Sequence, residues 1–157
     1  MHQTNNLPIN PAHAAMLDSY VQQEQHNAPH IEYTGDWLDQ GNGIYIRTAR
    51  VAYPYTPTDQ PSITFAETHA IACQPDHTRR IFYQETERRY YPNIHAYALN
   101  AMANDPNIIG WSDWININKH DMFMSHSITK DHQQTAAHMI QCNGPNIQRL
   151  TLHPITD

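Results

Sequence analysis

The stretch Ser62-Ile63-Thr64-Phe65-Ala66-Glu67-Thr68-His69-Ala70-Ile71-Ala72-Cys73 alternates between two kinds of side chain. Successive side chains of a β-strand point to opposite faces, so residues two apart share a face. We therefore predict a strand over 62–73. Threonine and alanine side chains form one of its faces, and the predicted core face carries Ile63, Phe65, Glu67, His69, Ile71 and Cys73.

Strands are also predicted on both sides of this stretch. The segment 44–53 is rich in β-branched and aromatic residues and follows the turn signal Gly41-Asn42-Gly43. The segment 79–87 follows a Gln74-Pro75-Asp76 turn. Short connections between three such strands indicate an antiparallel meander.

Two helices complete the predicted architecture. Asn10 followed by Pro11 is a typical helix start, and apolar residues recur at helical spacing to about Gln25. A second helix is predicted from Thr129 to Cys142, with Ala136, Met139 and Ile140 on one face. Weaker patterns favour a short helix over 94–103, a strand over 108–117 and a last strand over 147–152.

Together these elements predict an α+β fold with an antiparallel β-sheet of four to six strands, an N-terminal helix and a C-terminal helix. Residues 1–9 are predicted to be a polar tail and residues 10–157 a single domain. The predicted core contains Ile63, Phe65, Ile71, Ile81, Trp114, Met139 and Ile140.

The composition argues against two classes of protein. The chain has 157 residues and a formal net charge of -6, and an acidic surface repels phosphate backbones, so nucleic-acid binding is not predicted. It holds no run of about 18 apolar residues, so no transmembrane segment is predicted. Only 15% of its residues are charged, a composition commoner in exported proteins.

Two cysteines lie far apart in the chain, at Cys73 and Cys142. They form no C-x-x-C pair and no cysteine–histidine pair at metal-binding spacing, so one disulfide between them is predicted. Two free buried thiols are the alternative. A disulfide indicates an oxidising compartment, so the chain is predicted to be periplasmic or surface-exposed, its signal peptide having been removed.

Two groups of residues allow alternative chemistry. The densest cluster of histidine and methionine contains His120, Met122, Met124 and His126, whose thioether and imidazole groups suit Cu(I), or zinc with Asp121; packing in the core is the other interpretation. Glu67 and His69 point the same way from one strand. They could form the general-base pair of a small hydrolase or a buried structural hydrogen bond.

The order of several landmarks resembles a known family. These landmarks are Gly43-Ile44-Tyr45-Ile46-Arg47, the strand ending at Cys73, Arg80-Ile81-Phe82-Tyr83, Trp114-Ile115, and Cys142 with Asn143-Gly144-Pro145. From Leu7 to Arg149 the chain resembles the CNP-one-like domain of Gram-negative envelope proteins, an uncharacterised family. It departs from that pattern at Tyr55–Pro61 and at Thr68, where the family has glycine.

The landmark order is also similar, more distantly, to the surface-adhesin protein E family. Both resemblances imply an exported domain. The first implies no known activity, and the second implies binding to host extracellular proteins.

The prediction that follows is an exported, non-enzymatic envelope domain that binds another protein or a cell-surface macromolecule, or has a structural role. No cofactor is predicted. Rigid aromatic side chains concentrate binding energy. The candidate contacts are therefore Tyr53, Tyr55, Tyr90 and Tyr91, which could instead pack within turns. A periplasmic copper- or zinc-binding protein and a small hydrolase are the alternatives.

Overall fold

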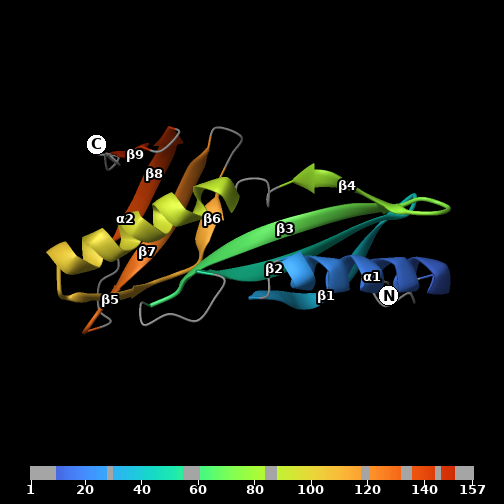
Figure 1. The fold of residues 1–157 in the computed structure, drawn as a ribbon, viewed down its shortest axis with the longest axis horizontal. Helices are drawn as coiled ribbons and strands as arrows, with labels where there is room; N and C mark the ends of the chain where they lie inside the picture. The colour runs from blue at the N-terminus through green and yellow to red at the C-terminus, as the bar shows by residue number, and fades with distance from the viewer. Residues whose placement is uncertain are drawn as a thin grey trace, which may run out of the picture. The chain divides into compact units, whose positions relative to one another are not determined.

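The structure is a computed structural model that describes residues 10–27, 30–54, 61–83, 88–117, 121–131, 136–143 and 146–150. Figure 1 shows the helices and strands of these residues along the chain. Their order is α1 (Pro11–Asn27), β1 (Ile31–Gly41), β2 (Ile44–Tyr53), β3 (Ile63–Cys73), β4 (Thr78–Tyr83), α2 (Tyr91–Asn104), β5 (Ile108–Trp111), β6 (Trp114–Asn116), β7 (Met122–Thr129), β8 (Ala137–Asn143) and β9 (Asn146–Leu150).

The chain divides into two compact units. Unit 1 contains Met1–Val51 and Glu67–Glu85, and unit 2 contains Ala52–Ala66 and Thr86–Asp157. The strand β3 contributes its first residues to unit 2 and its remaining residues to unit 1. Neither described helix is long and apolar enough to cross a membrane.

Unit 1 is one helix on one face of an antiparallel sheet. Its strands follow the order β1-β2-β3-β4, and α1 lies along the face that the predicted alternation assigned to the core (Figure 1). The side chain of Asn10 accepts a hydrogen bond from the backbone N–H of Ala12 at 2.8 Å, which confirms the predicted helix start. The helix buries Leu17, Tyr20 and Glu24.

The predicted turn between β1 and β2 is also present. Asn42 and Gly43 have φ values of 57° and 75°, the left-handed region that asparagine and glycine adopt at low cost. The carbonyl of Gly43 accepts a hydrogen bond from the backbone N–H of Cys73 at 2.8 Å, so the turn is fixed to the end of β3.

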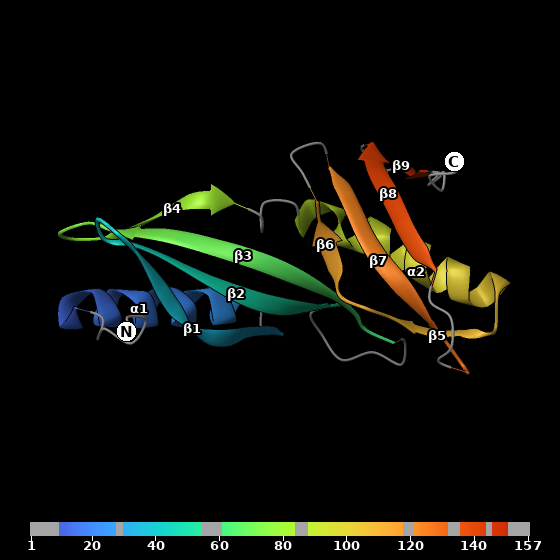
Figure 2. The same cartoon turned by 180° about the vertical axis from the view of Figure 1, so that it is seen from behind.

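Unit 2 repeats the plan of a helix on a sheet. Its strands follow the order β3-β6-β7-β8-β9, β5 pairs with β7, and α2 covers one face of the sheet (Figure 2). β3 and β6 run parallel to each other, and Phe65 of β3 pairs with Trp114 of β6. The ring of Phe65 stacks on Tyr91 of α2, with 3.7 Å between centroids and 9° between planes.

The predicted C-terminal helix is wrong. Residues 137–143 form strand β8, which pairs with both β7 and β9. Burial alternates along β8, with His138, Ile140 and Cys142 buried. Ala136, Met139 and Ile140 have helical spacing, whereas His138, Ile140 and Cys142 alternate as in a strand, and pairing on both edges decides between the two. The described residues form nine strands rather than four to six, so the fold is α+β but dominated by its sheet.

The predicted disulfide is wrong as well, because Cys73 and Cys142 are not joined by a disulfide. The prediction assumed that a C-terminal helix packs against β3. Instead Cys142 lies in β8 of unit 2, opposite Ile147, whereas Cys73 ends β3 in unit 1, opposite Thr78.

Most of the predicted core is confirmed. Ile63, Phe65, Ile71, Trp114 and Ile140 are all at most 3% exposed. Met139 is only half-buried, because it points away from the face that carries Ile140. The side chain of Ile81 and the tail 1–9 lie outside the described residues.

Candidate functional site

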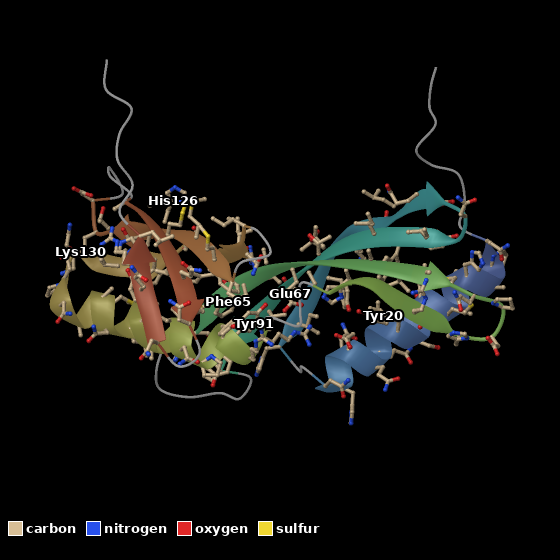
Figure 3. The ribbon with its side chains drawn as sticks, turned by 90° about the horizontal axis from the view of Figure 1, so that it is seen from above. Tyr20, Phe65, Glu67, Tyr91, His126 and Lys130 are labelled. Atoms are coloured by element: carbon tan, nitrogen blue, oxygen red, sulfur yellow. The ribbon has the colours of Figure 1, made fainter. Side chains whose placement is uncertain are left out.

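The core of unit 1 contains a carboxylate and a histidine in contact. The Nε2 atom of His69 lies 2.8 Å from Oε1 of Glu67, and neither side chain is exposed to solvent. Both come from the core face of β3, where the two-residue spacing places them side by side, as predicted. Figure 3 labels Glu67 on β3 and Tyr20 on α1.

Two tyrosine hydroxyls meet the other nitrogen of this histidine. The Nδ1 atom of His69 lies 3.1 Å from the hydroxyl of Tyr20 on α1 and 3.1 Å from the hydroxyl of Tyr33 on β1. If Nε2 donates to the carboxylate, Nδ1 of the neutral ring is an acceptor with one lone pair, which the two hydroxyls share. The network therefore links α1, β1 and β3.

Aromatic rings and a guanidinium group surround the same network. Tyr20 and Tyr33 each contact Trp37, with 6.1 Å between ring centroids, and Arg47 lies 5.2 Å from the ring centroid of Tyr33. A cavity of about 520 Å³ opens near α1, lined by Tyr20, Glu24 and the β3–β4 turn, but neither Glu67 nor His69 lines it. The pair is thus packed inside the unit.

A cavity of about 740 Å³ in unit 2 lies between α2 and the sheet. The helix contributes Tyr97, Asn100 and Asn104 to its wall, which are spaced three and four apart and so share one side of α2. Asp105 follows at the end of the helix, and Asn107 lines the next turn. This wall presents amides, a phenol and a carboxylate.

The opposite wall comes from the sheet. Ser127 and Thr129 of β7, His138 of β8 and Arg149 of β9 line the cavity. The burial pattern places Ser127 and His138 on the face that packs towards α2. Three neighbouring strands thus direct hydroxyl, imidazole and guanidinium groups into one space.

His138 is neutral at physiological pH. Burial, helped by the charges of Arg149 and His126, lowers its pKa to about 4. Its Nδ1 atom lies 2.7 Å from the hydroxyl of Tyr97, which donates the hydrogen bond to this unprotonated nitrogen. Trp111 packs on the ring, with 4.7 Å between centroids. The pair His138–Tyr97 therefore joins the two walls of the cavity.

Serine hydroxyls of β7 are committed to the backbone. Ser125 donates to the carbonyl of Ser112 at 2.6 Å, and Ser127 lies within hydrogen-bond distance of the carbonyl and the N–H of Ala136. Within the described part of the chain, neither hydroxyl is hydrogen-bonded to a histidine ring. The arrangement therefore gives no support to a serine nucleophile activated by histidine.

The predicted aromatic contacts occupy different environments. Tyr91 is 2% exposed and Tyr90 is 8% exposed, so both rings lie in the core of unit 2. Tyr53 is half-buried and packs on His95 with 5.3 Å between centroids. Tyr55 lies outside the described residues.

The predicted metal-binding residues are partly brought together. Met122, Met124 and His126 share the outward face of β7, where the alternating burial leaves each half-buried. His120 lies outside the described residues. Within the described part of the chain, no three histidine, cysteine, aspartate or glutamate side chains are grouped to hold a metal ion.

The pocket of unit 2 was not predicted from the sequence. Tyr97 and His138 are 41 residues apart in the chain and meet only because β8 is a strand next to β7. Comparison with known families, with curated proteins and with solved structures finds no match for this chain. The resemblance to envelope families therefore stays a prediction.

Proposed function

We propose that this chain is a non-enzymatic binding domain whose pocket in unit 2 holds a sugar unit of a larger glycan. The observation that carries the proposal is the mixture of groups around that pocket. Amides from Asn100, Asn104 and Asn107 line it together with the carboxylate of Asp105 and the guanidinium of Arg149. A sugar hydroxyl both donates and accepts hydrogen bonds, and each asparagine amide offers an NH₂ donor and a carbonyl acceptor. The lining of the pocket can therefore bind several sugar hydroxyls.

The charges around the pocket support a neutral ligand. One carboxylate, Asp105, and one guanidinium, Arg149, line it, and His138 adds no charge at neutral pH. A strongly anionic ligand would be repelled by the carboxylate of Asp105, and a cationic ligand would be repelled by the guanidinium of Arg149. The volume of about 740 Å³ lies within the range of pockets that bind small molecules.

The number of carboxylates supports binding without hydrolysis. Glycosidases commonly use two carboxyl groups on opposite sides of the bond that they cleave. Among the side chains that line this pocket, Asp105 is the one acid. The buried Glu67–His69 pair belongs to unit 1 and does not line its cavity, so the hydrolase alternative gains no support from it.

The test is binding to an array of immobilised bacterial and host glycans, followed by titration calorimetry with the best-bound oligosaccharide. Replacing Asn100→Ala or Asn104→Ala should weaken binding by about fivefold to tenfold each, the effect of one lost hydrogen bond. Asn143→Ala is the matched control, because Asn143 is exposed in the same unit and does not line the pocket.

Binding that is lost in the two pocket variants and kept in the control supports the proposal. The absence of binding to any immobilised glycan would refute it. Equal binding by all three variants would show that the glycan binds outside this pocket.

A further inference from the structure

The sheet of unit 2 has a second face, which points away from α2. Along β7 the buried residues are Phe123, Ser125 and Ser127, so the residues between them point outward. The same alternation along β8 leaves Met139 and Gln141 outward. This open face therefore carries the methionine and histidine side chains of β7 together with a methionine of β8.

Strand pairing places two of these methionines directly opposite each other. Met124 of β7 is the register partner of Met139 of β8. Cβ atoms of directly opposed residues are about 5 Å apart, and residues two apart along one strand are separated by about 6.7 Å. His126 follows Met124 on the same face and is the diagonal neighbour of Met139. The three side chains thus form a compact triangle.

The surroundings of this triangle are apolar. Ile115 of β6 pairs with Met124, and Leu150 of β9 pairs with Met139, so the row Ile115–Met124–Met139–Leu150 crosses four strands. No acidic side chain points outward from the described residues of these strands. A hard divalent cation, which prefers oxygen ligands and negative charge, would find no acidic side chain on these strands.

We propose that Met124, Met139 and His126 form a binding site for a single Cu(I) ion on this open face. Thioether sulfur is a soft ligand that selects Cu(I), and imidazole is a good copper ligand. Methionine has three rotatable bonds and can turn its sulfur towards an ion above the sheet. Figure 3 shows sulfur atoms, in yellow, beside the labelled His126.

This site is independent of the proposed glycan pocket. Side chains at alternate positions of β7 and β8 serve the two faces, with Ser127 and His138 on the pocket side and Met124 and Met139 on the open side. Each proposal can therefore fail without the other.

The first test is a titration of the protein, labelled with ¹³C at its methionine methyl groups, with Ag(I) as a redox-inert substitute for Cu(I). The six methionines allow each resonance to be assigned by substitution with leucine. Cys73→Ser serves as the background, because the half-buried Cys73 thiol would compete for the ion. One equivalent of Ag(I) should shift the resonances of Met124 and Met139 and leave those of Met16 and Met102 unchanged.

The second test is competition for Cu(I) against a chromophoric chelator under anaerobic, reducing conditions. Met124→Leu, Met139→Leu and His126→Ala should each weaken binding by about tenfold or more, since loss of even an outer partner of a metal site costs that much. Met102→Leu is the matched control, because Met102 lies on α2 and the open face points away from that helix.

Unfolding in urea should show that the leucine variants fold as the parent does, since leucine and methionine have similar volumes. Unchanged Cu(I) affinity in the Met124→Leu/Met139→Leu double variant would overturn the proposal. A loss in Met102→Leu as large as that in Met124→Leu would also overturn the assignment to these three side chains.

Discussion

The imidazole of His69 lies 2.8 Å from the carboxylate of Glu67 in the core of unit 1, and neither side chain is exposed. Burying such a pair is costly unless hydrogen bonds satisfy its polar atoms. The hydroxyls of Tyr20 and Tyr33 supply these bonds at Nδ1. Because the four residues come from α1, β1 and β3, the stability of unit 1 should depend on this network.

Removal of the carboxylate is expected to be strongly destabilising. Glu67→Ala leaves the Nε2 atom of His69 without its carboxylate partner and opens a cavity, so the free energy of unfolding should fall by about 3–5 kcal/mol. Glu67→Gln keeps an acceptor of similar size and should cost less. Urea unfolding followed by circular dichroism measures both, and equal losses would contradict the role of the acceptor.

The two tyrosines are expected to substitute for each other. Both hydroxyls lie 3.1 Å from the same nitrogen, so either one can satisfy it alone. Tyr20→Phe and Tyr33→Phe should each cost about 1 kcal/mol or less, and the double variant should cost more than the sum. A double-mutant cycle on urea unfolding gives the coupling, and strict additivity would show that the hydroxyls do not share the ring nitrogen.

We predict that Gly43, in the turn between β1 and β2, tolerates substitution by alanine less well than Gly35 in β1. A Cβ at Gly43 would lie 3.0 Å from the carbonyl oxygen of Cys73, whereas a Cβ at Gly35 would meet nothing within 4 Å. Both have positive φ, at 75° and 63°, so an alanine costs about 1–2 kcal/mol in backbone strain at either.

Gly43→Ala should therefore lower the free energy of unfolding more than Gly35→Ala. The expected difference is about 1 kcal/mol, the usual size of a modest packing conflict. Thermal and urea unfolding of the two variants measure it directly. Equal losses would mean that the Cys73 carbonyl can move aside without cost.

Because Cys73 and Cys142 form no disulfide, we predict that the chain has two titratable thiols. The unreduced chain unfolded in denaturant should react with two equivalents of a thiol reagent, because neither cysteine is bonded to the other. In the folded protein Cys73 should react first, since Cys142 is 1% exposed. Burial raises the pKa of Cys73, so its reaction should accelerate as the pH rises above the usual thiol range. The absence of reactive thiols in the unfolded chain would contradict the structure.

Local patterns were sufficient to predict three features of unit 1. The alternation along 62–73, the Asn10-Pro11 helix start and the Gly41–Gly43 turn each depend on neighbouring residues and were confirmed. Unit 2 depends on long-range pairing. The segment around Met139 satisfies both helical and strand spacing, and only pairing with β7 and β9 makes it a strand. Short apolar segments are ambiguous for this reason.

The same error concealed both candidate sites of unit 2. A helix at 129–142 would not set Met139 opposite Met124 or His138 beside Tyr97. The predicted metal cluster contained Met122, Met124 and His126, but the contribution of β8 could not be seen from sequence spacing. The prediction of an exported location, which rested partly on the disulfide, now depends on composition and on the family resemblance alone.

Because the pKa of His138 is lowered in the folded protein, we predict that the free energy of unfolding falls in acid. Its pKa is about 4 in the folded protein, against about 6.5 in an unfolded chain, so the unfolded state binds the proton first as the pH falls. The stability that the neutral ring contributes is complete above pH 6.5 and decreases progressively between pH 6.5 and about 4. The full difference corresponds to about 3 kcal/mol.

The control for this prediction is His138→Asn. The asparagine carbonyl takes a position close to that of Nδ1, so it can accept the hydrogen bond from Tyr97, but it does not titrate. Urea unfolding between pH 7.5 and 4 should show a steeper decline in the parent than in the variant, because other acid-sensitive groups affect both equally. If the two declines were parallel, His138 would have the same proton affinity in the folded and unfolded states, and the neutral ring assigned to the pocket would be wrong.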